Sequence, residues 1–350
     1  MRIRTTTIGA WPKPTDIPIP DWFQQEKTTD ANPTEALDSC ERCFDDDISE
    51  LLDKVTQEVV MAQVNVGIDI PTDGEIRREN YIHSHCRHME GISFDRLTKK
   101  AMRSGAWEVF VPTITHSIRP GNPFLVREWQ VAQAVTHCPV KITLPGPMTI
   151  MDSVADEFYG SERKLARALS ETLNFEIIKL AEAGCRWIQV DEPVFARYPE
   201  FALSFGVENL ERCFKGVNRE VTRCTHICCG YPDKVDSTDY IKAPSSAYSL
   251  LAPALDEAAI DAVSIEDAHR PNDLSLLELF GNTIVILGVL GIARTRIESI
   301  EEIELRLREA MGHIEKDRLI AAPDCGLGML NQETVLAKLK NLRQAVERIG

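Results

Sequence analysis

The sequence predicts an α/β protein built as a single (βα)8 TIM barrel, with elaborations over the mouth at the carboxyl ends of its strands. Short apolar runs that end in Gly, Asp, Glu or Pro alternate with amphipathic helical stretches, as in a parallel sheet made of βα units. A chain of 350 residues, 43% of them hydrophobic, can bury a core of that size. Eight such runs in this length favour a closed barrel over an open sheet.

The predicted strands are spread along the whole chain, and their carboxyl ends are expected at one mouth. Each is an apolar run bounded by turn residues. They are residues 3–10, 66–75, 139–146, 185–193, 221–229, 261–267, 283–291 and 318–326.

Three of the intervening helices carry clear signals. One is expected between Ser161, an N-cap residue, and Gly184, a stop signal. Its apolar stripe comprises Leu165, Leu169, Leu173, Ile177 and Leu180. Ser299 and Glu302 have capping-box spacing at the start of a second helix. A last helix is expected over about 331–349, where leucines, Val and Ile recur on one face.

Two stretches are too long for a minimal barrel. Residues 11–50 are rich in proline and acidic residues, and residues 76–138 include the strand-like "WEVFVPTITHSI". We interpret both as insertions over the barrel mouth and not as separate domains. Residues 1–350 are therefore predicted to form one domain.

Charge and composition exclude several classes of function. A formal net charge of -15 and a pI near 5.1 repel phosphate backbones and anionic lipids, so neither nucleic acid nor membrane is expected as a partner. The start of the sequence lacks a secretory signal, and no apolar run reaches the roughly 20 residues that span a bilayer, which predicts a cytoplasmic protein. Ten cysteines in a chain of this length indicate reduced thiols or metal thiolates.

Reactive side chains stand at the carboxyl ends of the predicted strands. Strand interiors in a parallel barrel are covered on both faces, so reactive groups must come from these ends. In order, the ends carry Ile8 to Ala10, Asp73, Glu75, Pro145 to Pro147, Asp191, Glu192, His226, Cys228, Glu266, Gly288 to Ala293, and Cys325. Acids, a histidine and thiols are therefore expected on one rim.

One subset of these residues suits a soft metal ion. His226 and Cys228 are two residues apart, so both side chains point to the same face of an extended strand. Alone, this pattern is more often a strand with buried free cysteines, and that interpretation stays open. With Glu266 and Cys325 from two other strand ends, the pair forms a set of two thiolates, an imidazole and a carboxylate. Thiolates select zinc over magnesium or calcium.

Such a centre would carry a charge of about -1 and would be poorly suited to making hydroxide. It is suited to holding an added thiol, because a metal-bound thiol loses its proton near neutral pH and the thiolate is the nucleophile. The implied chemistry is alkyl transfer to sulfur.

Seven short motifs are specific in their order and spacing. They are "TTTIGAWP", "DGEIRRENY", "LPGPMTI", "IQVDEP", "THIC", "SIED" and "APDCGL". From about residue 3 to 330 they resemble the catalytic barrel of the cobalamin-independent methionine synthase family. The resemblance implies a zinc-dependent S-methyltransferase that forms methionine from homocysteine.

The resemblance also assigns roles to rim residues. It implies four zinc ligands, His226, Cys228, Glu266 and Cys325. Glu75 and Asp191 are expected to act catalytically by binding the amino group of homocysteine, while the backbone from Ile8 to Ala10 binds its carboxylate. Carboxylates do pair with an ammonium, and strand-end N–H groups do bind anions. The alternative for Glu75 and Asp191 is helix capping at βα turns, and Glu192 is interpreted as a local support.

The departures from the family pattern concern the methyl donor. Ser153 stands where the family has a tryptophan on which the folate ring stacks, and Ala293 stands where it has a histidine thought to assist proton delivery to the departing folate. Ala10 replaces a family serine, and 350 residues leave no room for the family's second, amino-terminal barrel. We therefore hypothesise a donor other than ordinary polyglutamyl methylfolate, such as a methylated corrinoid protein or a partner-delivered methyl group.

Two other functions stay open at this stage. The first is a zinc-dependent alkyltransferase acting on another small thiol such as coenzyme M, whose sulfonate and missing amino group do not suit the carboxylates of Glu75 and Asp191. The second is a non-catalytic barrel that stores or senses zinc. A corrinoid- or porphyrin-handling relative of the same fold is a further possibility, but such proteins need no thiolate pair.

The sequence also leaves open whether the chain forms a homodimer.

Three weaker motifs have simpler interpretations. The stretch 83–88 is interpreted as a structural or substrate-contacting loop, although it offers His83, His85, Cys86 and His88 as candidate ligands. The Cys-x-x-Cys of residues 40–43 lies in an acidic stretch and is expected on a solvated helix. Arg77 and Arg78 either bind an anionic part of the donor or pair with nearby acids.

Overall fold

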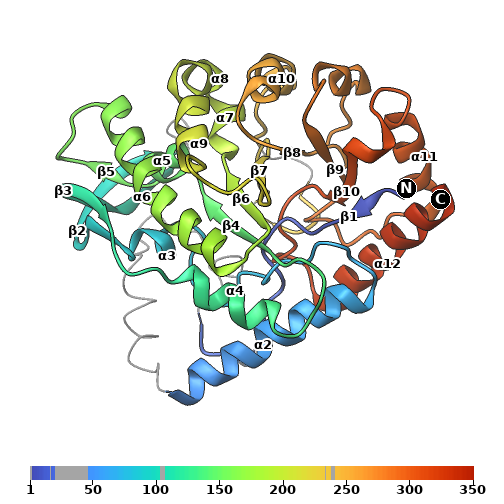
Figure 1. The fold of residues 1–350 in the computed structure, drawn as a ribbon, viewed down its shortest axis with the longest axis horizontal. Coiled ribbons are helices and arrows are strands. Elements are labelled where there is room, and N and C mark those ends of the chain that lie inside the picture. Colours follow the sequence, from blue (N-terminus) through green and yellow to red (C-terminus); the bar gives the residue numbers. More distant parts are fainter. Residues whose placement is uncertain (1, 16, 20–45, 103–106, 233, 238–240) are drawn as a thin grey trace.

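A curled parallel sheet runs through the centre of the molecule, and helices surround it (Figure 1). The computed structural model describes residues 2–15, 17–19, 46–102, 107–232, 234–237 and 241–350. Within these residues the sheet has seven strands in the order β1-β10-β9-β8-β7-β6-β4, each parallel to its neighbours. The α/β class and the curled parallel sheet are therefore confirmed.

Seven of the eight predicted strands belong to this sheet. They are β1 (Arg4–Thr5), β4 (Lys141–Pro145), β6 (Trp187–Asp191), β7 (Thr222–Ile227), β8 (Ala262–Ile265), β9 (Ile284–Leu290) and β10 (Leu319–Pro323). Every residue of β4, β6, β8 and β10 is buried. Both faces of these strands are covered, which is why their sequences read as nearly continuous apolar runs.

The prediction of a regular second strand over residues 66–75 is wrong. In the described part of the chain this segment contributes two single parallel bridges. Thr6 of the first segment pairs with Ile70, and Thr72 pairs with Lys141 of β4. Pro71 between them has no N–H to donate to a ladder, although its carbonyl accepts the Lys141 N–H at 2.8 Å. The two edges of the sheet are thus joined by isolated bridges in place of an eighth regular strand.

The helices lie between and around these strands. Their bounds are α2 (Asp46–Asn65), α3 (His83–Cys86), α4 (Leu125–Gln133), α5 (Pro147–Asp152), α6 (Glu162–Ala183), α7 (Pro193–Arg197), α8 (Pro199–Phe201), α9 (Val207–Cys213), α10 (Ala247–Glu257), α11 (Ile300–Ala310) and α12 (Gln332–Ile349). Short 3-10 helices cover Leu274–Leu279 and Lys316–Arg318, and a π-helix covers Ala202–Gly206. No helix among the described residues is long and apolar enough to cross a bilayer.

The predicted helix signals are confirmed, with one exception. The side chain of Ser299 accepts the Glu302 N–H, and the Glu302 side chain accepts the Ser299 N–H, so α11 begins with a full capping box. Gly184 ends α6 in the left-handed conformation with φ 109°. Ser161 stands at the N-cap of α6, but its side chain makes no capping hydrogen bond. α12 begins and ends within one residue of the predicted bounds.

The insertion at 76–138 contains a long hairpin. Strand β2 (Met89–Met102) pairs antiparallel with β3 (Trp107–Pro120), and β3 also pairs with the short β5 (Ala155–Asp156). Figure 1 shows this second sheet at one side of the molecule. Of the insertion at 11–50, the last residues already form the start of α2, and the Cys-x-x-Cys at 40–43 lies outside the described residues.

A second, smaller hydrophobic cluster lies apart from the main core. It comprises Ile8, Ile70, Trp187, Cys224, Ala262, Ile286, Ile320 and Ala322. These residues come from β6, β7, β8, β9, β10 and the segments around β1, so they line the concave side of the curled sheet. Lys141 is the register partner of Trp187 and therefore shares this face, where its side chain is fully buried.

Candidate metal and substrate site

Three soft ligand atoms meet at the carboxyl ends of β7 and β10. One ligand atom each from His226, Cys228 and Cys325 lies within 4.8 Å of the others. His226 is the penultimate residue of β7 and Cys228 follows its last residue, while Cys325 stands two residues beyond β10. The expected convergence of a histidine and two distant thiols on one rim is therefore observed.

A hydrogen bond orients the imidazole of His226 toward the thiols. Its Nδ1 pairs with the hydroxyl of Ser264 at 2.9 Å, and its Nε2 lies 3.3 Å from the Sγ of Cys325. Ser264 is the register partner of His226 on β8. An outer hydrogen bond of this kind fixes the ring of a metal-binding histidine and leaves the other nitrogen for the ion.

The thiols of Cys228 and Cys325 have pKa values that are shifted in opposite directions. The hydrogen bond from Cys325, supported by His226, holds the pKa of Cys228 well below its usual range despite burial. The same hydrogen bond raises the pKa of Cys325. Burial lowers the pKa of His226, but the nearby Cys228 outweighs burial and the net shift is upward. One thiolate beside a thiol and an imidazole is a donor set that fits a soft divalent ion.

Glu266 does not join this group of three. It directly follows β8, as predicted, but one carboxylate oxygen accepts the backbone N–H of Cys229 at 2.9 Å. The other oxygen lies 2.9 Å from the ammonium of Lys242. Burial raises the pKa of Glu266, partly offset by Lys242. The role of Glu266 as a fourth ligand stays a prediction.

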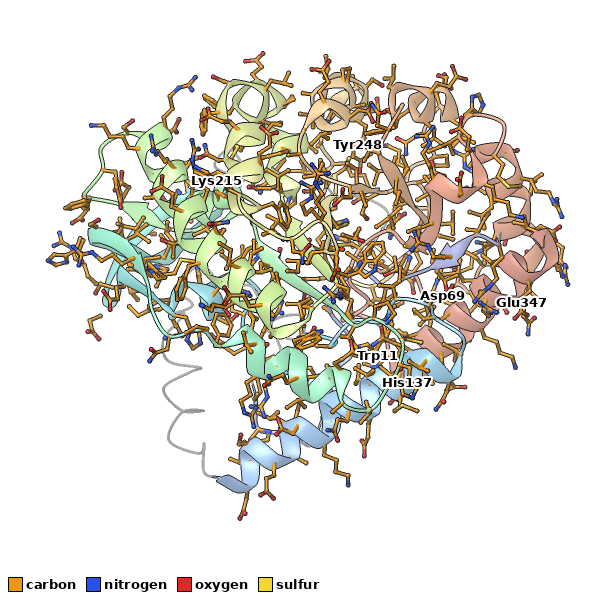
Figure 2. The ribbon with its side chains drawn as sticks, viewed as in Figure 1. Trp11, Asp69, His137, Lys215, Tyr248 and Glu347 are labelled. Carbon is orange, nitrogen blue, oxygen red and sulfur yellow. The ribbon has the colours of Figure 1, made fainter. Side chains whose placement is uncertain are left out.

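The hydroxyl of Tyr248 links the two strand ends that carry these residues. It donates to the carbonyl of Ile227 at 2.8 Å and accepts the N–H of Glu266 at 3.0 Å. Tyr248 is buried and lies on α10, and Figure 2 labels it there. One side chain therefore sets the spacing of β7 and β8 beside the three ligand atoms.

Asp191 ends β6 as a buried carboxylate held by two donors. Its Oδ2 accepts the hydroxyl of Tyr81 at 2.8 Å, and its Oδ1 accepts the amide of Gln189 at 2.7 Å. Burial raises the pKa of Asp191 to about 7, although His226 and these donors oppose the shift. Its charge can therefore be changed by a bound cation at neutral pH.

Glu75 is equally buried but is paired inside the protein. It accepts the hydroxyl of Thr143 at 2.6 Å and lies 3.3 Å from the guanidinium of Arg78. Burial raises its pKa, and Arg78 opposes the shift. A side chain at Gly9 would have its Cβ 2.4 Å from the Glu75 carboxylate, so the "IGA" segment packs directly on this group.

The segment after β1 is hydrogen-bonded to the ends of two strands that carry candidate site residues. The carbonyl of Ile8 accepts the amide of Gln189 at 2.9 Å, and the carbonyl of Ala10 accepts the N–H of Leu327 at 2.7 Å. Both residues are therefore anchored to the strand ends that carry Asp191 and Cys325. Binding of a substrate carboxylate by their N–H groups stays a prediction.

Neighbouring polar residues support the backbone. The carboxylate of Glu192 accepts the N–H groups of Met148 and Thr149 at the start of α5, as expected for a local support. Asp324, next to Cys325, accepts three successive N–H groups from residues 267–269 after β8. These bonds tie together the turns that carry the candidate site.

The weaker motifs are resolved by their contacts. Arg77 pairs with Asp53, and Arg78 pairs with Asp73 and Glu75, so both arginines serve ion pairs within the protein. The candidate ligands of residues 83–88 do not form a three-residue metal group within the described chain. His85 and His88 line a cavity of about 20 Å³, which is large enough for about one water molecule.

Comparison with known proteins assigns this chain to a family. A sequence model described as "Cobalamin-independent synthase, Catalytic domain" matches residues 3–348. The chain belongs to this family. As a member of it, the chain is an enzyme, a methyltransferase of the methionine synthase type.

Relatives cover nearly the whole chain. A protein from Sulfolobus acidocaldarius named methionine synthase is 28% identical over 349 residues, which cover 97% of this chain and 89% of that protein. A B12-independent methionine synthase from Shewanella sp. W3-18-1, solved in complex with selenomethionine, is 27% identical with a TM-score of 0.86, covering 100% of this chain and 98% of that one. A putative vitamin-B12 independent methionine synthase from Listeria monocytogenes is 17% identical with a TM-score of 0.73 over 100% and 99% of the two chains, which shows a likeness of fold alone.

Four residues of the site were missed by reasoning from sequence, namely Tyr81, Lys242, Tyr248 and Ser264. Tyr81 ends the "DGEIRRENY" motif, so the motif itself was a signal for it. Ser264 is two residues before Glu266 and could have been found by the alternation of a strand. Lys242 and Tyr248 reach the site from the loop and the helix after β7. No motif or periodicity in the neighbouring sequence predicts their contact with the site.

Proposed function

We propose that this chain is a zinc-dependent homocysteine S-methyltransferase that forms methionine. The observation that carries the proposal is the group of ligand atoms from His226, Cys228 and Cys325 within 4.8 Å, in a chain that belongs to this family. Two thiols and an imidazole favour zinc over harder ions. When bound, zinc would hold the substrate thiol as a thiolate, which is the nucleophile in alkyl transfer.

The carboxylates of the rim are proposed to bind the amino acid. Asp191 lies at the end of the strand beside His226, and its register partner on β7 is His226 itself. A carboxylate at this position can pair with the ammonium of an amino acid whose sulfur lies at the three ligand atoms. We assign the same role to Glu75, and we assign the carboxylate of the substrate to the backbone of Ile8 and Ala10.

The proposed acceptor therefore carries both a thiol and an ammonium group. Coenzyme M would place a sulfonate beside Asp191 and Glu75, and like charges in a buried site repel strongly. A binding comparison of homocysteine with coenzyme M separates the two acceptors. Binding of coenzyme M alone would contradict our assignment.

The proposed donor is a methyl group carried by something other than ordinary polyglutamyl methylfolate. Ser153, which replaces the stacking tryptophan of the family, is buried and uses its hydroxyl and carbonyl in bonds to Thr149 and His83. Ala293, which replaces the family histidine, is also buried. Neither position offers an aromatic face or a proton to a departing pterin. Candidate donors are a methylated corrinoid protein and a methyl group delivered by a partner.

The metal assignment is tested by removing one ligand. Cys325→Ser should lose most of its bound zinc and its methyl transfer to homocysteine, because a soft thiolate becomes a poor neutral ligand. Cys229→Ser is the matched control, since this buried thiol is adjacent to the site but absent from the three-atom group. Elemental analysis and a methyl-transfer assay measure both properties. Full zinc occupancy in Cys325→Ser would overturn the assignment.

The donor is tested with a panel of methyl donors and homocysteine as acceptor. Methylated corrinoid is expected to be used faster than polyglutamyl methyltetrahydrofolate. Turnover of the folate at a rate normal for full-length members of the family would overturn this part of the proposal, and would leave the zinc and homocysteine assignments standing.

A further inference from the structure

Gln189 is a buried residue of β6 whose amide donates two hydrogen bonds. Its Nε2 donates to Oδ1 of Asp191 at 2.7 Å and to the carbonyl of Ile8 at 2.9 Å. The residue is fully buried, and its Oε1 lies 3.9 Å from the Sγ of Cys224. Because both partners of Nε2 are acceptors and an amide nitrogen carries two hydrogens, the side chain uses all of its donors in these two bonds.

The two bonds join parts of the fold that are not neighbours in the sheet. Gln189 and Asp191 are two residues apart on β6, so their side chains lie on the same face of the strand. Ile8 is 181 residues away and follows β1. Four strands of the sheet, β10, β9, β8 and β7, lie between β1 and β6. The bond to Ile8 therefore crosses the concave side of the curled sheet, where the side chain of Ile8 also packs.

The segment that Gln189 holds has features of an anion-binding backbone. Residues 8–10 are buried and lie outside the regular strands. Within the described part of the chain, none of their three N–H groups donates to a protein acceptor, whereas the N–H of the next residue, Trp11, donates to the carbonyl of Gly74 at 3.0 Å. Buried N–H groups are nearly always paired, so three successive ones without a protein partner indicate that this segment binds a polar ligand. A carboxylate is such a ligand.

We propose that Gln189 is a positioning residue that fixes the distance between the two subsites for an α-amino acid. These subsites are the carboxylate of Asp191, which takes the ammonium, and the backbone of Ile8 to Ala10, which takes the carboxylate. The proposal rests on the function proposed above and adds a residue that selects acceptors carrying both charged groups. An amino acid has these groups on one carbon atom, so subsites held at a matching distance bind it with a smaller loss of entropy.

The experiment compares homocysteine with two analogues, the thiol acid that lacks its amino group and the amino thiol that lacks its carboxylate. All three carry the same thiol, so the contribution of sulfur to binding cancels in the ratios of their dissociation constants. Calorimetric titration of the zinc-loaded protein gives these constants. The variant is Gln189→Met, which keeps the length of the side chain and removes both N–H groups.

Gln189→Met should lose the preference for homocysteine over both analogues. Its affinity for homocysteine should fall about tenfold, the change that corresponds to a lost hydrogen bond to a charged group. Each analogue uses a single subsite, which can adjust by itself, so its affinity should change by less than about threefold. An unchanged preference for homocysteine would overturn the proposal.

Two further variants separate the bond to Ile8 from other effects at Asp191. Tyr81→Phe removes another donor to Asp191 and leaves the bond to Ile8 intact, so it should change the affinities for homocysteine and the amino thiol by the same factor. Gln189→Glu keeps the length of the side chain and can share one proton with Asp191, but it has none left for the carbonyl of Ile8. It should therefore lose the preference as Gln189→Met does.

Either of two results would contradict the role of the bond to Ile8. One is a full preference for homocysteine in Gln189→Glu. The other is a fall in the ratio of homocysteine to amino thiol affinity in Tyr81→Phe as large as that in Gln189→Met.

Failure of this proposal is distinguishable from failure of the proposed function. If the unaltered zinc-loaded protein does not bind homocysteine, the proposed function and the role of Gln189 fall together. If it binds homocysteine more tightly than both analogues and Gln189→Met retains that preference, only the role of Gln189 is overturned.

Discussion

The buried carboxyl group of Asp191 shows how one residue's environment decides what it can bind. Tyr81 and Gln189 donate to its oxygens, yet burial dominates and raises its pKa to about 7. With a pKa of about 7, this carboxyl group is only about half ionised at neutral pH, and a paired cation favours its charged form. An ammonium group bound beside Asp191 is therefore expected to change its protonation near neutral pH.

This property predicts a pH-dependent affinity for the product. Protonated Asp191 cannot pair with an ammonium, so the affinity for methionine should fall as pH drops below about 7 and should level off above it. Asp191→Asn should bind methionine about tenfold or more weakly at high pH, without this dependence. Calorimetric titration across neutral pH checks both. An identical pH profile in the two proteins would contradict the assignment of Asp191.

Lys141 is a second residue whose burial has a measurable consequence. Its Nζ is fully buried and has no hydrogen-bond partner among the described residues. Burial lowers its pKa from 10.5 to about 8. Because the folded protein binds this proton less readily than the unfolded chain, burial of this lysine destabilises the protein in full below about pH 8. This penalty shrinks as the pH rises from about 8 to about 10.5.

Lys141→Met is accordingly expected to stabilise the protein at pH 7. The difference between 10.5 and about 8 corresponds to roughly 3 kcal/mol in the free energy of unfolding as an upper limit, and the gain should vanish above about pH 10.5. Lys338→Met is the matched control, because Lys338 is equally buried but pairs with Glu298 at 2.7 Å, so its removal should destabilise. Denaturant unfolding measures both. A loss of stability in Lys141→Met would show that its charge is used.

At the level of elements, the site depends on how the ends of β7 and β8 are spaced. Register pairs His226 with Ser264 and Ile227 with Ile265, and beyond this point the strands separate into different turns. The hydroxyl of Tyr248 bridges that point with two hydrogen bonds. A helix that follows β7 thereby holds the two strand ends together.

Tyr248→Phe should affect both stability and metal binding. It leaves the carbonyl of Ile227 and the N–H of Glu266 without this partner, which should lower the free energy of unfolding by about 1–3 kcal/mol. Zinc affinity should fall as well, because the strand ends that carry the ligands are no longer fixed. Tyr159→Phe is the control, since its hydroxyl accepts the Ile118 N–H at 2.9 Å in the β2–β3 sheet. An equal loss of zinc affinity in both variants would contradict a specific role for Tyr248.

For the whole molecule, the closure of the sheet depends on a side chain from α2. Gln63 is fully buried, and its amide accepts the N–H of Thr72 at 3.0 Å and donates to the carbonyl of Thr72 at 2.9 Å. It also accepts the hydroxyl of Thr7 at 2.6 Å. These bonds pair the backbone of Thr72 where a regular strand would form a ladder, so the irregular segment can still join β1 and β4.

Gln63→Leu is expected to destabilise the protein by about 2–4 kcal/mol, because buried backbone groups of Thr72 lose their partners. Gln57→Leu on the same helix is the matched control, since its amide makes only a 3.5 Å contact to the carbonyl of Val131. Equilibrium unfolding in denaturant compares them. A loss in Gln57→Leu as large as that in Gln63→Leu would show that general perturbation of α2 is responsible.

The sequence by itself determined the features that depend on neighbouring residues along the chain. Apolar runs and their turn residues located seven strands, and the capping box of Ser299 and Glu302 located a helix start. Because all parallel strands end at one rim, His226, Cys228 and Cys325 could be placed together from their positions alone. Local periodicity and the direction of strands carry this information.

Only the tertiary structure decided which distant side chains complete these features. Lys242 reaches Glu266, Tyr81 reaches Asp191, and Gln63 replaces the eighth ladder next to Pro71, where a regular strand was expected. Each pair is separated by bends of the backbone that no local pattern encodes. The physical reason is that a buried polar group must find a partner in space, and the fold, not the order of residues, determines which partner is within reach.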